Sequence, residues 1–249
     1  MLWEKKNCCI ANDDYRLTIS VGIGNPNEET IVKLDGSNRS YQIIFGFIHE
    51  LFWDSTTNVN YKTFTDKDSD CFVEITNSKL IHELEKISSG MTVDENLRHF
   101  KIKGLNATID IITAETFIIS ELTKDTYSSD ITSDSKIALN EPIERGYYYL
   151  GCRVEVENSL SFTLESNKNT YEIDFANANS INVISETYDL LPRIPTNSAQ
   201  VLGGQKGYVF TIKENGSILG YKILGLENYN AYVFTESCPE IYSIQSNTN

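Results

Sequence analysis

The sequence is poor in the residues from which metal and redox sites are usually built. Its 249 residues include three histidines and five cysteines, and no two cysteines have the C-x-x-C spacing that clamps zinc or forms a redox loop. Cys8 and Cys9 are adjacent, and the odd total favours free thiols over a disulfide framework. The scarcity excludes a zinc finger, a thioredoxin-like motif and a small disulfide-stapled fold.

Long apolar runs are also missing, which bears on the compartment. The longest candidate, 43–53, contains His49 and Glu50 and is much shorter than the ~20 residues that span a bilayer. The first residues run from Met1 into charged Glu4 without the apolar stretch of a signal peptide. We expect a cytoplasmic protein without a membrane span.

Basic residues are outnumbered, with 21 lysines and arginines against 35 aspartates and glutamates, and the net charge is −14. Up to Asp125 there are 13 basic and 20 acidic residues, and after it 8 and 15. An evenly acidic surface repels phosphate backbones and favours encounter with basic partners. The charge therefore argues against nucleic-acid binding and indicates either a basic protein partner or solubility alone.

The familiar catalytic motifs fail at specific positions. His49 and His82 each precede a glutamate, but a zinc protease needs a second histidine one helical turn later, where this chain has Trp53 and Lys86. A phosphate-binding glycine loop and a G-x-S-x-G serine elbow are both missing. We expect no catalytic residue, no metal and no cofactor.

Two acidic patterns keep hydrolase chemistry open as a third reading. The loop Asp66–Asp70 alternates carboxylates like the start of a calcium site, but Cys71 and Asn77 stand where an EF-hand has glycine and glutamate. Several glutamates on neighbouring predicted strands could approach as a glycosidase pair: Glu155, Glu157, Glu165 and Glu172. Alternation with apolar residues favours solvated, outward-facing carboxylates instead.

Apolar alternation predicts a mainly β (α+β) protein, with antiparallel β-sandwich or meander sheets and one or two short helices. The clearest strand is 16–24, where every second residue is a branched aliphatic. The dipeptide at 215–216, Asn-Gly, predicts a hairpin with a type I′ turn. The best helix lies near 77–89 with Asn77 as its N-cap, and a shorter helical turn is predicted at 93–97. For 41–53 the pattern fits a buried strand and a buried helix equally well.

The polar stretch 125–145 lacks apolar periodicity and is predicted to be a connecting loop. It divides the chain into a β-rich N-terminal (sub)domain, 1–124, and a β-rich C-terminal (sub)domain, 146–249. The segments 17–45 and 150–175 share an order of strand, turn, strand, turn and tyrosine-containing strand. This order raises internal duplication as an alternative to a simple meander.

Tyrosine is the positive feature, with 14 residues in the chain and three in succession at 147–149. Aromatic residues are favoured in strands for packing, and amphipathic rings also anchor interfaces. The candidate interface residues are Tyr147, Tyr148, Tyr149, Tyr208, Tyr221 and Tyr232.

We therefore expect a non-enzymatic binding protein, an acidic β-rich module that binds or neutralises a basic protein partner as an immunity protein or inhibitor does. The alternative is a self-assembling viral or phage structural protein, because tyrosine-lined β surfaces suit repeated contacts. A carboxylate- or metal-dependent hydrolase comes third.

Overall fold

The structure is a computed structural model that describes residues 3–4, 10, 13–22, 29–55, 71–87, 96–122, 135–139, 143–144, 146–155, 159–185, 200–201, 208–225 and 229–245. Within these residues the chain forms two large antiparallel sheets and one short helix, α1 (Lys79–Ile87). The predicted mainly β fold with antiparallel sheets and a short helix is confirmed.

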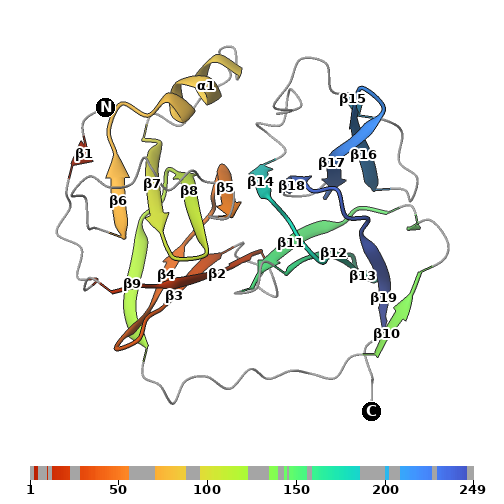
Figure 1. Cartoon of the computed structure of the whole chain (residues 1–249), viewed down its shortest axis with the longest axis horizontal. Helices are drawn as coiled ribbons and strands as arrows, with labels where there is room; N and C mark the ends of the chain where they lie inside the picture. Colours follow the sequence, from red (N-terminus) through yellow and green to blue (C-terminus); the bar gives the residue numbers. More distant parts are fainter. Residues whose placement is uncertain are drawn as a thin grey trace.

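We name the sheets A and B. In spatial order, sheet A contains β1 (Trp3–Glu4), β6 (Phe72–Ile75), β7 (Arg98–Lys103), β8 (Ala107–Thr113), β5 (Glu50–Ser55), β14 (Ser180–Ser185), β18 (Tyr229–Phe234), β17 (Ser217–Leu224), β16 (Val209–Glu214) and β15 (Gln200–Val201). Sheet B contains β10 (Ser135–Ala138), β19 (Glu240–Gln245), β13 (Thr170–Phe175), β12 (Leu160–Glu165), β11 (Tyr149–Val154), β2 (Arg16–Val21), β3 (Thr30–Asp35), β4 (Ser40–Phe45) and β9 (Phe117–Leu122). Figure 1 shows the strands up to β9, red to yellow-green, on the left and the strands from β10 onward, green to blue, on the right.

The inner faces of the two sheets meet in one apolar core. In β2 every second residue from Leu17 to Val21 is buried, as the sequence pattern predicts, and the residues between them face outward. Aromatic rings join the sheets: the ring centroid of Phe100 in sheet A lies 5.7 Å from that of Phe45 and 5.0 Å from that of Phe117, both in sheet B. The fold is therefore a sandwich of two sheets packed face to face.

Helix α1 begins one residue later than predicted. Asn77 has a positive φ of 53°, and the Ile81 N–H donates to Ser78 Oγ over 3.3 Å, so the N-cap is Ser78 and not Asn77. The other predicted helical turn, 93–97, lies largely outside the described residues. The helix packs through Leu80, Ile81 and Leu84 on an apolar cluster outside sheet A, formed with Ile112, Ile184, Ile212 and Tyr232.

The strand order of the N-terminal half, β2–β9, repeats in the C-terminal half, β11–β19. In sheet B, β2-β3-β4-β9 is matched by β11-β12-β13-β19, and in sheet A, β5-β8-β7-β6 is matched by β14-β18-β17-β16. The halves join where β2 pairs with β11 and where β5 pairs with β14. The structure thus shows the internal duplication as a repeated topology. The division into (sub)domains 1–124 and 146–249 stays a prediction, and β10 lies within the predicted connecting loop.

Hydrogen bonds at the junction are reciprocal, which reveals a two-fold relation between the halves. The Ser55 N–H donates to the Asn179 carbonyl over 3.0 Å, and the Ser185 N–H donates to the His49 carbonyl over 2.9 Å. Ser185 and Asn179 occupy the positions in the second half that Ser55 and His49 occupy in the first, at the end of one strand and just before it. A rotation that exchanges the halves therefore exchanges these two hydrogen bonds.

A buried tyrosine pair also recurs. The rings of Tyr15 and Tyr41 meet edge to face with centroids 6.0 Å apart, and those of Tyr148 and Tyr171 do the same at 5.8 Å. All four rings are buried. Burial raises the pKa of Tyr15 and of Tyr148 to about 12, because an ionised phenolate loses its hydration inside the sandwich.

The raised pKa values predict a loss of stability in alkali. A phenol whose pKa is higher in the folded state stabilises the fold fully below its unfolded pKa of about 10, and the contribution is lost as pH rises toward about 12. Urea unfolding measured from pH 9 to 12 should show this decline, and a Tyr15→Phe/Tyr148→Phe variant should show a shallower one. Equal slopes for the two proteins would contradict the assignment.

Candidate functional site

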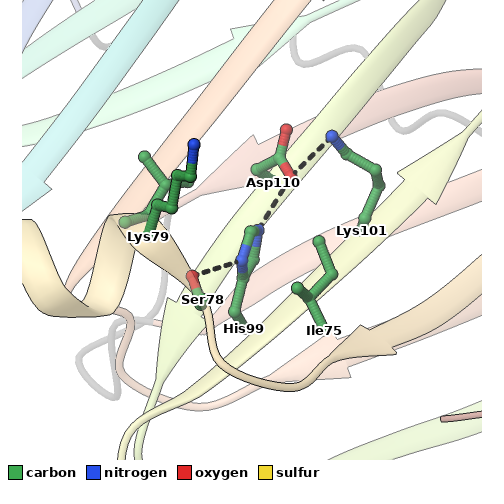
Figure 2. Close-up of a pocket in the computed structure, with 7 residues that line it drawn as sticks. Ile75, Ser78, Lys79, His99, Lys101 and Asp110 are labelled. Carbon is green, nitrogen blue, oxygen red and sulfur yellow. Dashed lines mark hydrogen bonds and ion pairs between the residues drawn. The ribbon is translucent and has the colours of Figure 1, made fainter. Parts of the chain in front are cut away.

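A pocket opens on the outer face of sheet A at the start of helix α1 (Figure 2). Its volume is about 220 Å³, enough to hold several water molecules. Residues from β6, β7, β8 and the first turn of α1 line it. The polar side chains in this lining are Ser78, Lys79, His99, Lys101 and Asp110.

Strand register explains why three of these side chains meet. His99 and Lys101 are two residues apart on β7, so both project to the same face of the sheet. Lys101 is the direct antiparallel partner of Asp110 on β8, and such partners have Cβ atoms about 5 Å apart. Ser78 reaches the group from the opposite side, because α1 lies over this face with its N-cap above β7.

The side chains form a continuous hydrogen-bonded chain (Figure 2). Ser78 Oγ lies 2.8 Å from His99 Nδ1, His99 Nε2 lies 2.8 Å from Asp110 Oδ1, and Lys101 Nζ lies 3.0 Å from the same oxygen. A carboxylate can only accept, so Nε2 carries a proton, and in the neutral imidazole Nδ1 then accepts from the Ser78 hydroxyl. With a neutral imidazole, the arrangement holds a serine hydroxyl against an unprotonated ring nitrogen.

The hydrogen-bonded side chains lie in the wall of the pocket and are shielded from bulk water. Ser78, His99 and Asp110 are 3%, 4% and 9% exposed. Asp110 also affects Asp54 on the neighbouring strand β5. Burial raises the pKa of Asp54, the negative charge of Asp110 raises it further, and the positive charge of Lys101 lowers it.

Other kinds of site are not found in the part of the chain that the structure describes. It holds no group of three histidine, cysteine or carboxylate side chains arranged for a metal, and none of its helices has the length and apolar character to cross a membrane. The cysteines in this part of the chain, Cys71, Cys152 and Cys238, are not in disulfide bonds. Comparison of the chain with protein-family models, curated protein sequences and solved structures gave no match. Function therefore has to be inferred from the chain's own geometry.

The six tyrosines proposed as interface residues divide into exposed and buried ones. Tyr147 and Tyr149 are 75% and 51% exposed. Tyr208 is half-buried, and the remaining three are buried: Tyr148, Tyr221 and Tyr232. Of these six, Tyr147 and Tyr149 are therefore the two whose rings are open to a partner.

Tyr148 anchors the two exposed rings. Its hydroxyl donates to the Glu144 carbonyl over 3.0 Å, and its ring meets that of Tyr208 edge to face at 5.0 Å. The Gly146 N–H in turn donates to the Tyr208 hydroxyl over 2.8 Å. Successive residues of an extended chain face opposite sides, so Tyr147 and Tyr149 point away from the core while the residue between them is held inside it.

The carboxylates considered for hydrolysis are placed differently from a catalytic pair. Glu172 accepts hydrogen bonds of 2.8 Å from both Lys136 and Ser161. Burial alone would raise the pKa of Glu172, but these bonds outweigh it and the pKa is lowered, the opposite of what a general acid needs. Glu155 and Glu165 are exposed. Glu157 and the acidic loop Asp66–Asp70 lie outside the described residues.

Sequence reasoning missed Ser78, His99 and Asp110 as a group. The sequence contained part of this information, because a hairpin with its turn at 104–106 pairs Lys101 with Asp110 and puts His99 on the same face as Lys101. The missing link was Ser78, because the contact of α1 with β7 joins segments that are 21 residues apart.

Proposed function

We propose that the chain is a binding protein that engages a basic protein partner through Tyr147 and Tyr149 and neutralises it by covering its surface. The observation that carries this proposal is the pair of exposed rings on either side of the anchored Tyr148. We call Tyr147 and Tyr149, with the neighbouring carboxylates of Glu144 and Glu165, the tyrosine surface.

Rigid aromatic side chains suit binding for an energetic reason. A tyrosine ring offers a large amphipathic area at a small cost in conformational entropy, and it loses still less when its backbone is already ordered. Tyr149 is part of β11 and pairs with Glu165 of β12. A partner that covers these rings gains buried area without first ordering this segment.

Charge indicates the sign of the partner. Glu144 and Glu165 are both exposed, Glu165 is the strand partner of Tyr149 and Glu144 lies three residues before Tyr147 in the sequence, and the whole chain carries −14. A negative rim around aromatic anchors speeds the encounter with a basic protein and disfavours acidic ones.

Affinity capture followed by titration tests the proposal. Partners captured on the wild-type chain are identified, purified and titrated by calorimetry against wild type and a Tyr147→Ala/Tyr149→Ala variant. We expect a basic partner whose Kd rises about 30-fold in the variant, as for loss of interface anchors. The affinity should also fall as salt rises from 0.1 M to 1 M, where the Debye length shrinks from about 10 Å to about 3 Å.

Ile118→Ala provides the matched control, since Ile118 is 65% exposed on β9 in the other half of the chain. This variant should bind the partner as wild type does. An acidic partner, or equal affinities for wild type and the double variant, would refute the proposal. Sizing of the pure proteins separates the alternative: large assemblies that the double variant abolishes would indicate the self-assembling structural role instead.

A further inference from the structure

We propose that the pocket at the start of α1 is a second, catalytic site, in which Ser78 is the nucleophile of an acyl-transfer reaction on short-chain esters. This activity goes beyond the proposed binding function and uses the opposite sheet. The observation behind it is the chain from Ser78 through His99 to Asp110, with both hydrogen bonds at 2.8 Å. A nucleophile bonded to a base, and a base bonded to an orienting carboxylate, is the constellation that activates serine.

The imidazole is held in the tautomer that the reaction needs. Asp110 accepts the Nε2 hydrogen, so in the neutral imidazole Nδ1 of His99 can take the proton of the Ser78 hydroxyl. This use of the two nitrogens is the reverse of the usual serine-protease arrangement, in which Nε2 faces the serine. General-base catalysis requires an unprotonated nitrogen within reach, and either nitrogen meets that requirement.

Each step then balances. Ser78 Oγ bonds to the acyl carbon while its proton moves to His99 Nδ1, which gives a tetrahedral oxyanion. The carbon–oxygen bond to the alcohol breaks, and the alcohol leaves with the proton from Nδ1. Water next attacks the acyl-serine and gives a proton to Nδ1, and the acid departs as Ser78 recovers its proton.

The first turn of α1 is placed to stabilise the oxyanion. The Ile81 N–H donates to Ser78 Oγ and the His82 N–H to the Ser78 carbonyl, so the N–H groups of Lys79 and Leu80 precede the first intrahelical bond. Both residues line the pocket beside Ser78. Backbone N–H groups at a helix N-terminus are effective donors to a developing negative charge.

The repeated half shows that the fold does not require the histidine and the carboxylate. The pairing of β7 with β8 has the same register as that of β17 with β18. The positions of His99, Lys101 and Asp110 therefore correspond in the second half to Gly220, Lys222 and Tyr232. A Cβ at Gly220 would lie 2.1 Å from the Val233 carbonyl oxygen, so this position carries no side chain. The lysine is kept, with Lys222 Nζ 4.9 Å from the Tyr232 ring centre. A stable sheet of the same topology thus forms without the hydrogen-bonded chain.

Labelling with an alkyl fluorophosphonate tests the proposal, because Oγ attacks phosphorus, fluoride leaves and the proton goes to His99. We expect one adduct on Ser78, mapped by peptide mass spectrometry of the folded wild-type chain. His99→Asn should slow the labelling by about 100-fold or more. Ser78→Asn keeps a good N-cap and should stay folded without the adduct. Hydrolysis of p-nitrophenyl acetate should fall in parallel in both variants.

Ser120→Ala is the control, because this serine is exposed on β9 in sheet B, and it should be labelled at Ser78 as wild type is. Thermal melting establishes that each variant is folded. A folded wild-type chain without an adduct at Ser78, or a labelling rate that His99→Asn leaves unchanged, would show that Ser78 only caps the helix and would overturn the proposal. Neither result bears on the tyrosine surface, which is tested by partner binding.

Discussion

Trp53→Ala should lower the free energy of unfolding by about 4 kcal/mol, the cost of removing a large buried aromatic side chain. Trp53 is fully buried and is the largest of the fully buried side chains among the residues that the structure describes. It lies in β5 between Ile109 of β8 and Ile181 of β14, and the pairing of β5 with β14 joins the two halves in sheet A. The cavity left by the alanine would open at the centre of the sandwich, where neither half can close it alone.

Urea unfolding of the variant beside wild type measures this effect. Ile118→Ala is the control, because its side chain is largely exposed and its removal should change stability by about 0.5 kcal/mol or less. We also expect both proteins to unfold in one transition, since each sheet runs through both halves. A loss below about 1 kcal/mol for Trp53→Ala would show that the side chain is not part of the packed core.

Local signals in the sequence were sufficient for many strands. The alternation of 16–24 predicts β2, because side chains two residues apart lie on the same face of a strand. Leu17, Ile19 and Val21 therefore share the buried face. The Asn215–Gly216 turn is also as predicted, with φ of 50° and 85°, because positive φ at both positions is what the type I′ hairpin requires.

The segment 41–53 could not be assigned to a strand or a helix from its pattern, and the structure explains why. It forms β4 and β5, which belong to different sheets. On the outer face of β4, between the buried Ile43 and Phe45, lies another apolar residue, Ile44. It pairs with Ile31 and Ile118 on the neighbouring strands. Apolar residues on both faces of a strand erase the alternation, and a crossing between sheets adds a turn inside the apolar run.

The exposure of each tyrosine depends on tertiary neighbours that the sequence does not display. Three successive tyrosines in an extended segment must alternate between the core and the surface, but the sequence does not say which face is the core. Packing of Tyr148 against Tyr171 and Tyr208 settles the direction. The same dependence on distant segments hid the group of Ser78, His99 and Asp110, whose members come from three elements.

Two threonines in equivalent positions of the halves should contribute equally to the free energy of unfolding. Measuring their contributions tests whether the duplicated halves share energetics as well as topology. The Thr113 hydroxyl donates to the Phe47 carbonyl over 2.7 Å and accepts from the Glu115 N–H over 3.0 Å. The Thr235 hydroxyl repeats this with Asn177 and Ser237, over 2.6 Å and 3.1 Å. Each threonine ties the end of one strand to the turn through which the chain crosses between sheets.

Thr113→Val and Thr235→Val should each cost about 2 kcal/mol in urea unfolding, because a carbonyl and an N–H lose their partner while the shape of the side chain is kept. The double variant should lose about 4 kcal/mol, since the two sites share no hydrogen-bonding residue. Thr163→Val, on the half-buried outer face of β12, is the matched control and should change little. If one threonine proved costly and its counterpart neutral, the halves would be alike in topology but would not share the energetics of this crossing.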